Sequence, residues 1–131
     1  MIVNELTAEI INAAMTVHSE LGPGLLESAY QGCLLFELHR RGIQAIGEVE
    51  LPVVYHGAKI DVVYRLDILV EETVILEIKS VESLARIHSA QLITYLRLSN
   101  KPIGLLLNFN VLSLKNGIKR LVGPSYQSAT P

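Results

Sequence analysis

The spacing of apolar residues along the chain predicts three helices. Apolar positions recur every three or four residues over 4–21 and again over about 25–41, which is typical of amphipathic helices. The segment 22–24, Gly-Pro-Gly, separates the two, because glycine and proline end helices. A third helix is predicted over 84–100, with Ser83 as its N-terminal cap.

Between the second and third helices, β-prone residues predict a run of three strands. The first strand, over 43–55, is interrupted by Gly47 and Pro52, so we expect an irregular or edge strand. Two further strands are predicted over 60–70 and 74–78, both rich in valine, isoleucine and leucine.

The residues after the third helix predict a buried strand followed by a hairpin. Residues 103–108 are almost wholly apolar, as in a strand that is buried on both faces. Residues 111–122 resemble a hairpin that turns at Asn116-Gly117, a dipeptide favoured in two-residue loops. Residues 123–131 show no pattern and are expected to form a loose tail, so the chain is expected to be one domain.

Composition and charge narrow the class of protein. Half of the 131 residues are apolar and 18% are charged, which indicates a globular domain rather than a disordered chain. No apolar run reaches the roughly 20 residues that span a bilayer, so we expect no membrane partner. The net charge of −2 argues against strong nonspecific nucleic-acid binding, which usually shows a basic balance.

The single cysteine, Cys33, cannot form an internal disulfide. Its isolation fits a reducing compartment, and no basic segment followed by an apolar block marks a secretory signal. We therefore expect a cytoplasmic protein. Cys33 falls within the apolar pattern of the second helix, so its thiol is expected to be buried and inert.

Two charged residues close the third predicted strand. Glu77 and Lys79 flank one apolar residue, so their side chains leave the same face of the strand. Asp67 lies among aliphatic residues in the strand before it. Charge at these positions needs an explanation, because charged residues are almost never fully buried unless they are paired.

The loop 71–73 decides whether these acids meet. With a three-residue loop, Val70 faces Val74 and Asp67 faces Glu77, whereas a two-residue loop would shift the register by one. In the first register two carboxylates converge beside the lysine, and close carboxylates repel unless they share a proton or a cation. Hard oxygen ligands of this kind suit Mg²⁺, which needs only one or two protein carboxylates besides water and phosphate oxygens.

The third predicted helix carries a polar stripe beside an apolar one. His88, Gln91 and Tyr95 share a face, and Leu92 with Leu96 suits packing onto the sheet. Two interpretations remain open for the polar stripe. It is either a partly exposed face, with the Tyr95 hydroxyl reaching water, or a face that lines the carboxylates and offers hydrogen bonds.

These residues resemble a known superfamily. Asp67 followed by Glu77-x-Lys79, on strands set between helices, resembles the motif of the PD-(D/E)XK nucleases. Gln91-x-x-x-Tyr95 resembles the additional motif of the RecB-type nucleases within that superfamily.

A further motif lies near the N-terminus. Gly24-Leu-Leu-Glu27-Ser-Ala-Tyr30 matches the pattern that names the GxxExxY proteins, which are assigned to the same superfamily. The resemblance covers about 4–122, with Leu66 standing where the first motif often has proline. It implies an α/β fold with a restriction-endonuclease-like core, in which helices flank a central mixed sheet.

The resemblance also implies a mechanism. Asp67, Glu77 and the backbone carbonyl of Ile78 would hold Mg²⁺ or Mn²⁺, which polarises the scissile phosphate and lowers the pKa of a bound water. Lys79 would orient that water or help to deprotonate it. Glu27 would bind the ion through water or hold a second ion.

Gln91 and Tyr95 would position the phosphate or the lysine by hydrogen bonds. The product would be a cleaved phosphodiester, in DNA rather than RNA. The sequence leaves two other interpretations open: a nuclease-fold module that binds nucleic acid or a protein without cutting, and a structural ion-pair network of Glu77 and Lys79 with Arg65 and Asp67. An exposed edge over 43–55 also makes a homodimer an expectation.

Overall fold

The computed structural model describes residues 1–126, and its elements follow the order of the predicted ones. These are α1 (Val3–Leu21), α2 (Glu27–Arg40), β1 (Ala45–Tyr55), β2 (Ala58–Val70), β3 (Val74–Lys79), α3 (Arg86–Ser99), β4 (Ile103–Asn108), the short 3₁₀ helix η1 (Leu114–Gly117) and β5 (Ile118–Val122).

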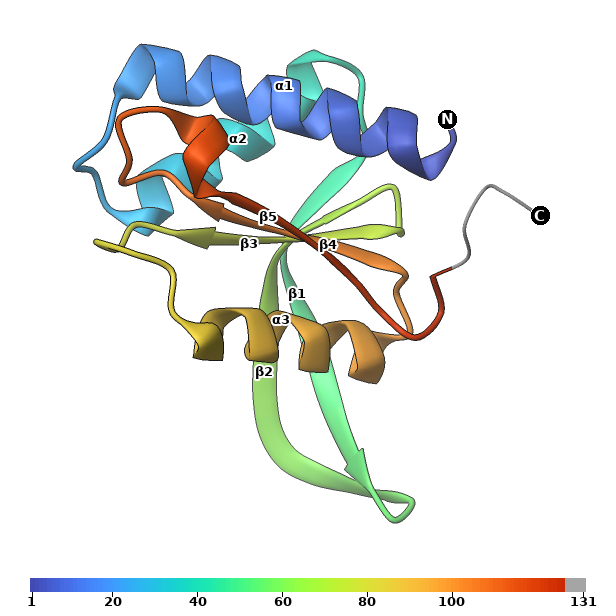
Figure 1. The fold of residues 1–131 in the computed structure, drawn as a ribbon. Helices are drawn as coiled ribbons and strands as arrows, with labels where there is room; N and C mark the ends of the chain where they lie inside the picture. Colours follow the sequence, from blue (N-terminus) through green and yellow to red (C-terminus); the bar gives the residue numbers. More distant parts are fainter. Residues whose placement is uncertain (127–131) are drawn as a thin grey trace.

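The strands form one five-stranded mixed sheet in the order β1-β2-β3-β4-β5. Strands β3 and β4 are parallel and are joined by the crossover helix α3, while every other neighbouring pair is antiparallel. Helices α1 and α2 lie on one face of the sheet and α3 on the other (Figure 1). This arrangement confirms the predicted α/β architecture of a central mixed sheet flanked by helices.

Each face of the sheet has its own hydrophobic cluster. The larger cluster packs α1 and α2 on the sheet and includes Leu34 and Leu76, which are fully buried. The smaller cluster lies under α3 and includes Leu92, Leu96 and Ile75. Because Ile75 and Leu76 are neighbours on β3, the alternation of a strand supplies both clusters at once.

The hairpin of β1 and β2 extends beyond the body of the domain as a two-stranded ribbon (Figure 1). We call residues 53–64 the β1–β2 arm; its register shifts between Pro52 and Val53. Strand β1 is an edge of the sheet, so the predicted irregular edge strand is confirmed. The arm exposes several large apolar side chains: Val54, Tyr55, Ile60, Val62, Val63 and Tyr64.

The predicted hairpin over 111–122 is wrong. Neither Asn116 nor Gly117 has the positive φ that a two-residue hairpin loop requires, and both belong to η1. Strand β5 instead pairs with β4, and Leu114 is buried in the larger cluster. Pairing along the available edge of β4 and burial of Leu114 outweigh the local turn preference.

The segment expected to be a loose tail is only partly described. Gly123 is buried, and its N–H donates to the carbonyl oxygen of Pro102 at 2.8 Å. Residues 127–131 lie outside the described residues.

Two smaller predictions are also corrected. Helix α3 begins at Arg86 with Ala85 as its cap residue, rather than at Leu84 with Ser83 as the cap. Cys33 is exposed, because the buried face of α2 is formed by Tyr30, Leu34, Glu37 and Leu38, and Cys33 lies outside that face. None of the helices in residues 1–126 has both the length and the apolar content of a membrane span.

Candidate active site

Asp67 and Glu77 lie opposite each other on β2 and β3. Val70 pairs with Val74, so the connecting loop has three residues and the register is the one that brings the two acids together. Both acids lie near the end of the hairpin pairing, where β2 turns toward the arm and β3 runs on beside β4. The sequence-based prediction of this register is confirmed.

Each carboxylate is held by the backbone of the opposite strand. Glu77 Oε2 accepts a hydrogen bond from the N–H of Asp67 at 3.0 Å. Asp67 Oδ2 accepts one from the N–H of Ile78 at 2.8 Å. Within residues 1–126, the second oxygen of each carboxylate, Oδ1 of Asp67 and Oε1 of Glu77, takes part in no hydrogen bond. The pair is therefore fixed in place while half of its oxygens remain available.

Burial makes two negative charges unfavourable here. Only 5% of Glu77 is exposed, and burial, followed by the nearby Asp67 carboxylate, raises the pKa of Glu77 to about 8. Burial also raises the pKa of Asp67 above its usual value. A site of this kind favours a shared proton or a bound cation over two free anions.

Lys79 supplies the positive charge nearest to the pair. It lies two residues after Glu77 on β3, and its ammonium lowers the pKa of both carboxylates. It forms no ion pair within 4.0 Å, and none of the ion pairs of the described residues contains Asp67, Glu77 or Arg65. The structural ion-pair network left open by the sequence is therefore not formed.

The backbone carbonyl of Ile78 belongs to the same group of oxygens. In an extended strand the N–H and C=O of one residue point toward the same neighbouring strand. Because the Ile78 N–H donates to Asp67, the Ile78 carbonyl also faces the β2 side of β3. Two carboxylates and one carbonyl therefore meet where β2 and β3 separate.

Helix α2 approaches the acids with two polar residues. Glu27 is exposed at its first turn, and its Oε2 accepts a hydrogen bond at 3.1 Å from the N–H of Ser80, which follows β3. Gln31, one turn later, donates from Nε2 to the carbonyl oxygen of Asp67 at 3.1 Å and to Glu48 Oε1 at 3.0 Å. The four-residue spacing from Glu27 could have pointed to Gln31. Nothing in the sequence pointed to Glu48.

The tyrosine of the Gly24–Tyr30 motif has a structural role. The Tyr30 hydroxyl donates to the carbonyl oxygen of Gly22 at 2.6 Å and accepts the N–H of Leu25 at 3.1 Å. Its ring is buried and stacks on Phe109, with ring centroids 4.6 Å apart. Tyr30 thus fixes the loop from which Glu27 emerges.

Helix α3 brings Tyr95, but not its whole polar stripe, to the acids. Only 8% of Tyr95 is exposed, and burial and then the Glu77 carboxylate raise the pKa of its hydroxyl. Gln91 lies one turn earlier and is exposed. His88 caps the helix, because its Nδ1 accepts the N–H of Ala85 at 3.0 Å.

A groove of about 550 Å³ lies beside the start of α2, and neither Asp67 nor Glu77 lines it. It is lined by Leu25, Leu26, Glu27, Ser28, Gln31 and Ser80.

A family model described as the PD-(D/E)XK nuclease superfamily matches residues 4–121. The chain belongs to this superfamily. Membership suggests a nuclease that acts on nucleic acid, and nucleases of the superfamily generally use divalent metal ions. No curated protein and no solved structure matches the chain.

The residues of this superfamily member fit a divalent cation. Asp67, Glu77 and the Ile78 carbonyl offer hard oxygen atoms, and Mg²⁺ is usually held by one or two carboxylates with water completing its shell. The unbonded carboxylate oxygens and the raised pKa of Glu77 both favour a cation at this place. No group of three or more His, Cys, Asp and Glu side chains in residues 1–126 could hold an ion by itself. Water and phosphate oxygens would therefore have to supply the remaining ligands.

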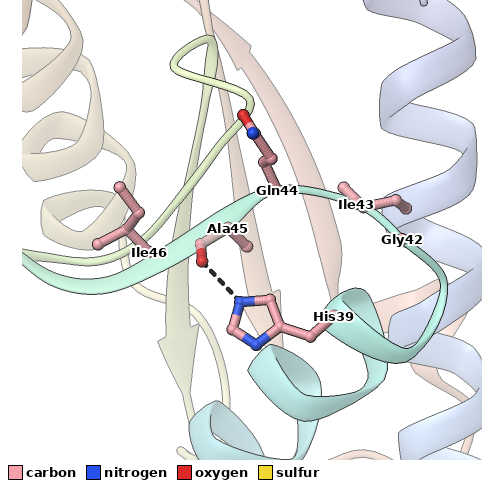
Figure 2. A pocket seen from close by; sticks show the side chains of 6 residues that line it. All are labelled: His39, Gly42, Ile43, Gln44, Ala45 and Ile46. Carbon is pink, nitrogen blue, oxygen red and sulfur yellow. Dashed lines mark hydrogen bonds between the residues drawn. The ribbon is translucent and has the colours of Figure 1, made fainter.

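A second hollow, of about 460 Å³, lies where α2 leads into β1 (Figure 2). The Nε2 atom of His39 lies 2.7 Å from the carbonyl oxygen of Ala45 at its edge. The hollow is lined by His39 and residues 42–46, none of which is acidic. It contains none of the residues expected for nuclease chemistry.

Proposed function

We propose that the protein is a metal-dependent nuclease that hydrolyses phosphodiester bonds of nucleic acid, with DNA rather than RNA as substrate. The observation that carries this proposal is the pair of half-buried Asp67 and buried Glu77, fixed by backbone hydrogen bonds, with Lys79 two residues after Glu77 on β3. Membership of the PD-(D/E)XK superfamily supports the same reaction class, and the preference for DNA rests on that likeness.

The two acids and the Ile78 carbonyl would hold Mg²⁺ or Mn²⁺ in this proposal. An ion held there would supply charge to polarise the scissile phosphate and would lower the pKa of a bound water. Lys79 would orient the attacking water through its ammonium or, in its neutral amine form, accept the water proton, and its positive charge would offset the negative charge that develops on the phosphate. Hydrolysis then joins the water oxygen to phosphorus, and the leaving oxygen departs with a proton.

Three further residues have supporting roles in the proposal. Tyr95 would bind phosphate or Lys79 through its hydroxyl, and the effect of the Glu77 carboxylate, which raises the pKa of Tyr95, supports this role. Gln91 lies one helical turn away and would contact the substrate from the surface. Glu27 acts on the ion through water or holds a second ion, and the hydrogen bond to Ser80 keeps its carboxylate beside the end of β3.

Cleavage of labelled single- and double-stranded DNA, with RNA of the same sequence for comparison, tests the proposal. We expect cutting in Mg²⁺ or Mn²⁺ by the wild type and none in EDTA. Asp67→Asn keeps an acceptor for the Ile78 N–H and Lys79→Met keeps the length of the side chain, yet both should abolish cutting. Asp61→Asn, an exposed acid of the β1–β2 arm, is the matched control and should cut as the wild type does.

A second candidate function is a module that binds nucleic acid or a protein without cutting. The absence of a three-residue ligand group in residues 1–126 and the net charge of −2 favour it. Mn²⁺ binding that Asp67→Asn removes, without cutting of any substrate, would support this second function. Cutting by Asp67→Asn at the wild-type rate would contradict the proposed site.

Finer assignments belong to the same proposal. We assign the chain to the GxxExxY proteins, close to the RecB-type nucleases, and the Gly24–Tyr30 and Gln91–Tyr95 motifs support this assignment. A homodimer is proposed because β1 is an edge strand and the β1–β2 arm exposes apolar side chains.

A further inference from the structure

The alternation of β2 side chains between the two faces of the sheet is broken at Asp67. Leu66 packs in the smaller cluster under α3, whereas Ile68, two residues later, packs in the larger cluster under α1 and α2. Residues two apart on a regular strand share a face. The strand is therefore rotated at the residue between them, which is Asp67.

The alternation of side chains is also broken on β1, the strand next to β2. Ala45 belongs to the larger cluster, while Val49, four residues later, packs against the smaller one. Glu48 precedes Val49 with a φ of 55°, in the left-handed region that a non-glycine residue seldom adopts. The pairing of β1 with β2 is interrupted at Glu48, which stands opposite Asp67. The two strands thus rotate together at this one level of the sheet.

The rotation directs the Asp67 carboxylate along the sheet rather than toward a face. A side chain of a regular strand projects above or below the sheet. The carboxylate of Asp67 instead reaches sideways to the N–H of Ile78 on β3, at 2.8 Å. Without this rotation Asp67 would not meet the Ile78 backbone, and the oxygen atoms proposed to hold the ion would not converge.

One side chain from α2 is bonded to both rotated residues. Gln31 Nε2 donates to the Glu48 carboxylate at 3.0 Å and to the Asp67 carbonyl oxygen at 3.1 Å. Gln31 is half-buried, and it lines both the groove beside Glu27 and a smaller hollow of about 340 Å³ that reaches Glu48. The side-chain amide of Gln31 therefore links α2 to the level of the sheet at which β1 and β2 both rotate.

We infer that Gln31, acting together with Glu48, is a positioning residue that holds Asp67 in the orientation needed at the proposed metal site. The consequence of this inference for metal binding rests on the proposed function. The two hydrogen bonds from Gln31 to Glu48 and Asp67, which we call the clamp, are a property of the fold. Glu48 acts through its hydrogen bond to Gln31 and not as a ligand of the ion. Strained backbone persists only where the surrounding structure fixes it, and the hydrogen bond from Gln31 holds the Glu48 side chain beside Asp67.

Amide hydrogen exchange, measured by NMR on the full chain without metal, tests the clamp directly. Gln31→Met keeps the volume of the side chain but removes its donors. It should speed exchange of the Asp67 and Ile78 amides about tenfold or more, while buried amides of β4 such as Leu105 keep their protection. Gln44→Met is the control, since Gln44 is an exposed glutamine near the start of β1.

Mn²⁺ titration by calorimetry tests the consequence for the site. Loss of a residue that orients a metal ligand typically weakens binding by about 10–100-fold. We expect that loss in Gln31→Met and Glu48→Ala, with Gln44→Met unchanged. Glu48→Gln keeps the acceptor for Gln31 but lacks the charge, so it should bind Mn²⁺ as the wild type does.

The outcomes separate this inference from the proposed function. Unchanged exchange at Asp67 and Ile78 in Gln31→Met would overturn the inference, whether or not Mn²⁺ binds. Equal weakening by Glu48→Gln and Glu48→Ala would also overturn it, because the charge of Glu48 rather than its position would then matter. If the wild type binds no Mn²⁺, the proposed function fails, and faster exchange in Gln31→Met still supports the clamp.

Discussion

The Glu77 carboxylate accepts a hydrogen bond from the backbone N–H of Asp67, the residue whose own carboxylate raises the pKa of Glu77. The hydrogen bond and the ammonium of Lys79 favour the charged form of Glu77, while burial and the Asp67 charge oppose it. Burial is the largest of these effects, and the pKa rises to about 8. Near neutral pH the pair therefore retains a proton until a cation displaces it.

The first prediction concerns the pH dependence of stability. Because the pKa of Glu77 is higher in the folded protein than in the unfolded chain, the folded protein binds more protons between about pH 4.5 and 8. The contribution of Glu77 to the free energy of unfolding should therefore decrease as pH rises through this range, by up to about 1.4 kcal/mol per unit. Calorimetric melting of the wild type and Glu77→Gln should show a larger decrease in the wild type than in the variant.

Mg²⁺ should reverse this effect, because a ligand that binds the folded protein stabilises it. The rise in melting temperature on adding Mg²⁺ should be larger at pH 8 than at pH 5.5, since binding must displace the shared proton. Glu50→Gln, at an exposed position of β1, is the control and should respond as the wild type does. An equal rise at both pH values would contradict the shared proton.

The second prediction concerns Tyr30. Tyr30→Phe removes the hydroxyl that bonds to Gly22 and Leu25 but keeps the ring stacked on Phe109. Leaving these backbone groups without a partner should lower the free energy of unfolding by about 1–3 kcal/mol in a urea titration. Tyr55→Phe, in which an exposed hydroxyl is lost, should change it by less than about 0.5 kcal/mol.

The third prediction concerns Tyr95. Tyr95→Phe keeps the buried ring in the smaller cluster and removes only the hydroxyl near Glu77. We expect kcat for DNA cleavage to decrease about tenfold, equivalent to about 1.4 kcal/mol, with little change in stability. Tyr64→Phe alters the neighbouring ring, 6.1 Å away, and serves as the comparison. A variant with full kcat would limit Tyr95 to a packing role.

The fourth prediction concerns the β1–β2 arm. An isolated two-stranded ribbon is marginally stable in water, and this one exposes apolar side chains on a sheet edge. We expect sedimentation at micromolar concentration to show a dimer that Val54→Lys and Val63→Lys dissociate. Lys59→Glu, near the tip of the arm, is the matched charge change. Sedimentation as a monomer at all concentrations would exclude the dimer.

The sequence predicted those features that depend on residue period and loop length. The three-residue loop fixed the register of Asp67 and Glu77, and the spacing of Leu92 and Leu96 identified the buried face of α3. Prediction from the sequence failed where residues that are distant along the chain determine the local structure. Asn116-Gly117 favours a hairpin locally, but β4 offered an edge for β5.

Residues of the site itself were missed for the same reason. Gln31 could have been found from its four-residue spacing to Glu27, but Glu48 has no local signal, and only the fold brings both residues to Asp67. The left-handed conformation of Glu48 also carries no signal in its residue type, since glycine and asparagine are the usual occupants.

The two faces of the sheet give the acids separate supports. Gln31 reaches Asp67 from the side of α2, while Tyr95 on α3 lies near enough to Glu77 for that carboxylate to raise its pKa, and each helix is anchored in its own hydrophobic cluster. A substitution in one cluster can therefore move one acid's support while the other stays in place. Variation of the chain over evolution, or by design, could therefore adjust the proposed ion binding and substrate positioning one face at a time.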